Sequence, residues 1–319
     1  MNRQSVTRHA NIRKHAPQFA RGFTLIEMAI VLLIIGLALG MILNLTGGLM
    51  DAQKRKAVRI GLDTVDIALA NFVAVNKRLP CPANGSIASG ALNAGVETLQ
   101  VGSGLCNPAN QSNGVLPWVT LGISENDALD PWNGRITYRV QPALASNLLR
   151  LMNMSWCDPA GIAATGAGGI CNTSCTGSAC TSPSNFLANK GLDVWNGAPD
   201  PANVAGWATR GNNPASGTGA AYVMISHGPS GTGAYNNGGV LQPGTVLAGS
   251  NETPNLNNQA IAIPSALATT YRDARLNDNP APPIVPPLPP QPGYHFDDYL
   301  SHPSIVQVLN KASLGPRAH

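Results

Sequence analysis

Residues 22–43 read GFTLIEMAIVLLIIGLALGMIL, and this stretch constrains the architecture more than any other part of the chain. One acidic residue, Glu27, interrupts it, and from there to Met50 no charged residue occurs. Together with its flanks, the run reaches the ~20 apolar residues that a helix needs to span a bilayer. We therefore expect a transmembrane helix over residues 23–50.

The segment before this run is basic. Residues 1–22 contain five Lys or Arg side chains and no acidic one. A secretory signal would carry a shorter apolar run followed by a small-residue cleavage site. Here the run is longer and the small residue, Gly22, precedes it, so an ordinary secretory signal is excluded.

The order of these features carries a resemblance. A basic leader, Gly22, the string Phe23-Thr24-Leu25-Ile26-Glu27 and an unbroken apolar helix together resemble the class III signal of type IV pilins and of type II secretion pseudopilins. The resemblance implies that a prepilin peptidase removes residues 1–22 on the cytoplasmic side by cutting between Gly22 and Phe23. It further implies N-methylation of Phe23, and assembly with like subunits, other pilins or pseudopilins and an inner-membrane assembly platform.

The Glu27 carboxylate is energetically unfavourable within the apolar helix. A carboxylate in an apolar helix costs of order 2.5–3.5 kcal/mol at the bilayer centre, and less near the edge. The resemblance implies a partner, the α-amino group of Phe23 in a neighbouring subunit, whose ordinary pKa is roughly 8. In the alternative interpretation, the side chain only reaches to the membrane surface in a simple signal anchor.

Residues 51–76 predict an amphipathic continuation of the helix. The stretch contains no Pro, and apolar residues recur at spacings of 4, 3, 4 and 3, which places them on one helical face. These are Val58, Leu62, Val65, Leu69 and Phe72. Basic residues 54–56 and Arg59 follow the apolar run. They either contact lipid headgroups or pair with the acidic Asp63 and Asp66 of a neighbouring subunit. In the alternative interpretation, they form a solvated helix face.

Residues 77–319 predict a Gly/Pro-rich β head. Pro80 and Pro82 end the helix, and β-prone runs at 135–140 and 221–226 predict strands. The expected fold class is α+β: a long N-terminal helix packed on a small antiparallel sheet, with large loop insertions. The resemblance makes this head pilin-like, and it rests here on five strings in order: LPCPA at 79–83, GVLPWVTLG at 114–122, DPWNG at 130–134, ISHG at 225–228 and FDD at 296–298.

Through the resemblance, the FDD string at 296–298 implies a metal-binding site. Major pseudopilins bind calcium through an Asp-Asp pair and backbone carbonyls, and Asp297 and Asp298 occupy the matching place in order. Calcium takes six to eight oxygen ligands, of which two carboxylates supply a part. A long insertion separates this pair from the ISHG string, which departs from the family, and solvated or capping aspartates are the alternative.

The six cysteines fall into two sets. Cys81 and Cys106 form the first set. The spacing in the second set matches no paired C-x2-C zinc arrangement, so disulfides are favoured in a head outside the cytosol. This set consists of Cys157, Cys171, Cys175 and Cys180. We expect one bond between Cys81 and Cys106 and two within the second set, where three pairings remain open.

A proline-rich insert follows in the last quarter of the chain. Residues 280–292 read PAPPIVPPLPPQP and predict an extended polyproline II segment. Such segments are either exposed spacers or ligands for aromatic-lined grooves.

The charge balance and the motifs limit the classes of function that the chain can have. The chain has a formal net charge of +4, but without the five basic residues of the leader it is −1, which argues against nucleic acid as the main partner. His227 lies between Ser226 and Gly228 in no catalytic motif, so we expect it to bond a turn and expect no enzyme. We expect a structural filament subunit of the inner membrane, single-pass, with its head in the periplasm or on an extracellular filament. The alternative is an anchored extracytoplasmic binding or enzymatic domain.

Overall fold

The computed structural model describes residues 24–111, 114–155, 157–159, 182–196, 210–243, 252–257, 270–274, 276 and 295–316. The chain divides into two compact units, Met1–Gln53 and Lys54–His319. Within the part of the chain that the structure describes, none of the helices has the length and apolar character needed to cross a lipid bilayer.

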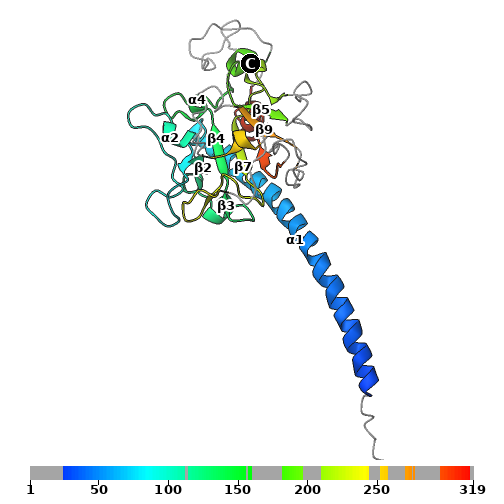
Figure 1. Ribbon diagram of the computed structural model, residues 1–319. Helices are drawn as coiled ribbons and strands as arrows, with labels where there is room; N and C mark the ends of the chain where they lie inside the picture. The colour runs from blue at the N-terminus through cyan, green and yellow to red at the C-terminus, as the bar shows by residue number, and fades with distance from the viewer. Residues whose placement is uncertain are drawn as a thin grey trace, which may run out of the picture. The chain divides into compact units, whose positions relative to one another are not determined.

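The long helix α1 spans Leu25–Asn76 and has 52 residues. In the first unit, its large apolar side chains between Leu25 and Leu37 are exposed. The helix ends at Asn76, as the sequence predicts. Lys77 follows with a left-handed backbone (φ of 58°), which terminates the helix before Pro80 and Pro82. The N-terminal helix and the α+β class are therefore confirmed (Figure 1).

In the described part of the chain, the main sheet has five short strands, all paired antiparallel. Their order is β1-β2-β4-β7-β10, and β2, β4 and β7 lie side by side in Figure 1. The strands are β1 (Ala83–Asn84), β2 (Gly114–Val115), β4 (Thr137–Val140), β7 (Tyr222–Ser226) and β10 (Tyr299–Ser301). Strands β4 and β7 fall in the two runs that the sequence predicts.

Strand β7 is buried on both faces. Its Tyr222 and Met224 belong to the core that includes α1, whereas Val223 and Ile225 belong to a second cluster with Tyr271. Alternate side chains of a strand point to opposite faces. A strand covered on both sides reads as a continuous apolar run, and YVMIS is such a run.

A second, three-stranded sheet supplies that second cover. It has the order β6-β5-β9, and β5 pairs with β9 in parallel. Its strands are β5 (Asp193–Asn196), β6 (Arg210–Asn212) and β9 (Thr270–Asp273). The sequence predicts a single antiparallel sheet, so this mixed sheet is an addition to the expected fold.

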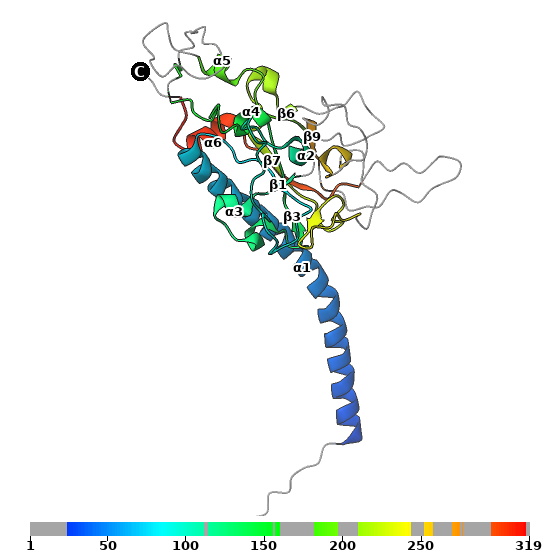
Figure 2. The same ribbon diagram turned by 90° about the vertical axis from the view of Figure 1, so that its left-hand side faces the viewer.

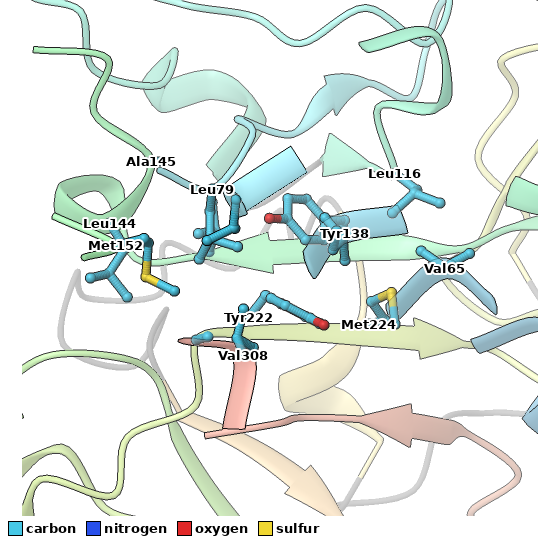
Figure 3. Packing of buried hydrophobic residues seen from close by; sticks show 14 of the residues in the cluster. Val65, Leu79, Leu116, Tyr138, Leu144, Ala145, Met152, Tyr222, Met224 and Val308 are labelled. Atoms are coloured by element: carbon cyan, nitrogen blue, oxygen red, sulfur yellow. The ribbon is translucent and has the colours of Figure 1, made fainter. Parts of the chain in front are cut away.

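The inner face of α1 packs on the main sheet. Val65 and Leu69 are fully buried, and Figure 3 shows Val65 close to Tyr138 and Met224 of the sheet. The predicted stripe is right except at its end. Phe72 is only half-buried, with the Arg78 guanidinium 5.2 Å from its ring, and the last fully buried position is Val73.

Asp66 contacts the head of its own chain and not a neighbouring subunit, which corrects the expectation from the sequence. Its carboxylate is buried and accepts hydrogen bonds from the hydroxyl groups of Tyr222 (2.8 Å) and Ser301 (3.1 Å). Lys311 lies 3.8 Å away, on the helix α6 that runs beside the end of α1 in Figure 2. Asp66 therefore joins α1 to its own head.

The remaining elements are short and connect the layers. Strands β3 (Gly134–Arg135) and β8 (Tyr235–Asn236) pair with each other, so the chain changes sheets at Ile136. The short α-helices are α2 (Pro108–Gln111), α3 (Trp118–Leu121), α4 (Pro142–Ala145), α5 (Pro183–Leu187) and α6 (Ile305–Lys311). Among the described residues, 3-10 helices span Glu125–Ala128 (η1), Pro214–Ser216 (η4) and Thr253–Asn255 (η5).

The loops around β3 converge on one buried side chain. The Arg135 guanidinium donates to the carbonyls of Gly85 (3.0 Å) and Ile87 (2.7 Å) and pairs with Glu125 at 2.9 Å. It also lies 4.9 Å from the Trp118 ring. Five donors in a fixed fork allow one arginine to hold several loops that have few apolar residues of their own.

The structure contains the Cys81–Cys106 disulfide that the sequence predicts. Cys157 is also disulfide-bonded. Cys171, Cys175 and Cys180 lie outside the described residues, so their pairing stays a prediction, as does the polyproline II conformation of residues 280–292.

The packing of α1 on the sheet predicts a large difference between two faces of the same helix. Leu69 is fully buried, and Leu69→Ala should lower the free energy of unfolding by about 2–5 kcal/mol. Ile67 is 60% exposed, and Ile67→Ala should change it by less than about 0.5 kcal/mol. Urea unfolding of the full chain in detergent, followed by tryptophan fluorescence, measures both. Equal effects would contradict this packing.

Candidate functional site

The start of α1 holds the residues that the N-terminal motif singles out. The backbone N–H and the hydroxyl of Thr24 both donate to Glu27 Oε2, at 2.8 and 2.9 Å, and the N–H of Glu27 donates back to Thr24 Oγ1 at 3.3 Å. This reciprocal pair is a capping box, which satisfies N–H groups that have no partner within the helix. Gly22 and Phe23 lie outside the described residues.

The cap gives Glu27 a role that needs no second subunit. The Thr-x-x-Glu spacing places the carboxylate at the helix N-terminus, where the helix dipole also favours a negative charge. The Glu27 side chain is exposed, and its hydrogen bonds hold it beside Thr24, the residue after Phe23. A carboxylate in this position is oriented to meet a cation that approaches the end of the helix.

A second group of polar side chains is buried at the end of β7. His227 Nε2 lies 2.9 Å from Thr137 Oγ1, and His227 Nδ1 lies 3.3 Å from Asp298 Oδ1. Carboxylate, imidazole and hydroxyl follow one another as in a hydrolase triad. However, Thr137 and His227 are fully buried, and Asn257 donates a hydrogen bond to the same hydroxyl. We interpret the arrangement as structural, because Thr137, the first residue of β4, and His227 are both fully buried.

Asp130 caps the turn in the string DPWNG. Its Oδ1 accepts from the N–H groups of Trp132 (3.0 Å) and Gly134 (2.8 Å), and its Oδ2 accepts from the Ser226 hydroxyl at 2.7 Å. Burial raises the pKa of the Asp130 carboxyl against these hydrogen bonds. The string therefore marks the point where the turn before β3 is bound to the end of β7.

The two adjacent aspartates of the expected calcium site have different partners. Asp297 accepts from the N–H (2.7 Å) and the hydroxyl (3.0 Å) of Ser230, in the turn after β7. Asp298 accepts from Asn255 Nδ2 at 2.8 Å and faces His227. Both are buried. In this geometry the chain itself supplies donors to both carboxylates, and calcium binding by the pair stays a prediction.

Two residues that the sequence does not point to lie beside Asp297. Glu252 Oε1 accepts from the N–H of Asp297 at 2.8 Å and lies 3.0 Å from His295 Nδ1. Burial and the neighbouring Glu252 raise the pKa of Asp297 to about 6, although the Ser230 hydrogen bond lowers it. Glu252 stands in a Gly/Asn-rich stretch without a recognisable motif, so nothing in its spacing identifies it.

The raised pKa of Asp297 predicts a pH-dependent stability in metal-free buffer. The folded state binds this proton more tightly than the unfolded chain, so the contribution is present below about pH 4 and is lost as pH rises through about 6. Relative to Asp297→Asn, the free energy of unfolding of the natural chain should fall by roughly 2–3 kcal/mol over that window. Urea unfolding at a series of pH values in EDTA measures it, and parallel profiles would contradict the shift.

Comparison with known proteins concerns the N-terminus. Residues 19–43 match the family model of the prokaryotic N-terminal methylation motif. Comparisons with curated proteins and with solved structures found no match. The matched stretch includes Gly22, Phe23 and Glu27 and ends before the head. Residues 19–43 therefore carry the N-terminal methylation signal of type IV pilins and pseudopilins.

Proposed function

We propose that the chain is a structural subunit, a pseudopilin or minor pilin, of a type IV pilus or type II secretion-like filament. The methylation motif at residues 19–43 carries the proposal, since it implies processing by a prepilin peptidase and pilin-type assembly. In this proposal the peptidase cuts between Gly22 and Phe23 and methylates Phe23. The helix that follows anchors the precursor in the inner membrane, with a pilin-like head outside the cytosol.

The exposure of the first part of α1 supports this role. Large apolar side chains from Leu25 to Leu37 are exposed, among them Leu32 at 64% and Leu33 at 63%. A contiguous apolar surface of this kind is unfavourable in water and marks a site of contact with lipid or protein. We propose that lipid covers it in the precursor and that the helices of like subunits cover it in the filament.

We propose no enzymatic role. The carboxylate–imidazole–hydroxyl arrangement of Asp298, His227 and Thr137 is buried and joined to the sheet by hydrogen bonds. Its residues hold β4, β7 and the 295–298 segment together. This interpretation favours a head that contributes shape and surface to a filament over an anchored enzyme.

The capping box allows the two roles of Glu27 to be separated. Glu27→Gln keeps a capping side chain, because glutamine also serves at this position, but it removes the charge. Glu27→Leu removes both, and Thr24→Val removes the hydroxyl while keeping the charge. We expect all three variants to be cleaved. Glu27→Gln and Glu27→Leu should be depleted about tenfold or more from sheared filaments, as expected for loss of a contact worth about 1.4 kcal/mol, and Thr24→Val should not be.

The matched variants decide between the interpretations. Normal incorporation of Glu27→Gln together with depletion of Glu27→Leu would show that Glu27 acts in assembly through the cap and not through its charge. Absence of the natural chain from sheared filaments would instead support the lone anchored domain. The measurement is the ratio of subunit in the filament fraction to subunit in the membrane, determined by immunoblot.

A further inference from the structure

One imidazole and two carboxylates converge inside the head, away from the N-terminal signal. Glu252 is 1% exposed, Asp297 2% and His295 8%. Glu252 directly precedes the 3-10 helix η5, and the other two precede β10. Ser230, in the turn after β7, binds Asp297 from the other side. Three stretches of chain therefore meet at this group.

The distances suit a small cation. One ligand atom from each of the three residues lies within 4.8 Å of the others, and His295 Nδ1 is 3.0 Å from Glu252 Oε1. In a tetrahedral zinc site with ligands at about 2.0–2.2 Å, neighbouring ligand atoms lie about 3.3–3.6 Å apart. Shifts of a few tenths of an ångström at this pair would bring both atoms to coordination distance.

The charges also suit a cation. Glu252 and Asp297 interact through their side chains, and two ionised carboxylates this close in a buried site repel each other unless a proton or a cation neutralises them. Each carboxylate oxygen of Asp297 accepts one hydrogen bond from Ser230 and has two lone pairs, so it can also bind a metal. His295 offers Nδ1 once that nitrogen carries no proton.

We propose that Glu252, His295 and Asp297 bind one divalent cation of the zinc class. An imidazole with two carboxylates is a ligand set for Zn²⁺ and related transition metals. Calcium takes oxygen ligands only, and six to eight of them. The site is distinct from the expected calcium pair, since it includes Asp297 and excludes Asp298, whose carboxylate faces Asn255 and His227.

The bound cation would act as a crosslink. It would join Glu252 to His295, 43 positions apart in the sequence, and through Ser230 it would fix the turn after β7. Binding to the folded state alone stabilises that state. This inference does not depend on the proposed filament role.

Metal titration of the full chain in detergent tests the proposal. After removal of metal with EDTA, Zn²⁺ at 100 times its dissociation constant should raise the thermal midpoint by about 5–10 °C. Glu252→Gln and His295→Asn should each weaken Zn²⁺ binding by more than about 100-fold, because each removes a direct ligand. His302→Gln is the control, since His302 bonds Asn212 and Asp273 elsewhere in the head.

A second measurement needs no variant. Co²⁺ in the natural chain should give the intense visible absorption of a tetrahedral site, and Zn²⁺ should displace it. The absence of a Zn²⁺-dependent rise in the midpoint would overturn the proposal. So would a rise that persists in both Glu252→Gln and His295→Asn, or stabilisation by Ca²⁺ alone that Asp298→Asn abolishes.

Discussion

Burial of the inner face of α1 is the interaction on which the head depends. The strands of the main sheet contain only two to five residues, and strands this short are not stable without a surface to cover. Val65 and Leu69 of the helix provide that surface and belong to the same buried cluster as Tyr138 and Met224 of the sheet. Figure 3 shows Val65 close to these two residues. The opposite face of β7 is left apolar, and the three-stranded sheet covers it.

Buried polar groups add contacts between segments in a head whose core is poor in aromatic residues. Aromatic residues are 5% and charged residues 11% of the chain, yet several of these charges are buried. Asp66 joins the helix to β7, and Asp130 joins a turn to the end of β7. Arg135 binds the loop at residues 85–87 and Glu125. Buried groups of this kind are costly unless they are paired. Their pairing gives a loop-rich head a defined structure.

The sequence predicted the features that depend on local order. The helix, its end before Pro80, strands β4 and β7 and the Cys81–Cys106 bond follow from periodicity, proline positions and the grouping of cysteines. Features that depend on contacts distant in sequence were missed. The position of Asp66 on the helix suggests a solvated face, and only the fold places Tyr222 beside it. Glu252 and His295 likewise belong to no motif, and the parallel pairing of β5 with β9 joins residues 77 positions apart, such as Asp193 and Thr270.

At the N-terminus, sequence and structure concern the same four residues. The string Thr24-Leu25-Ile26-Glu27 is at once part of the methylation motif and a capping box that begins α1. The most direct test of the filament role is the intact mass and N-terminal sequence of the chain recovered from sheared filaments. We predict a chain that begins at N-methylated Phe23. A chain that retains residues 1–22, or that begins beyond the apolar run, would contradict the account.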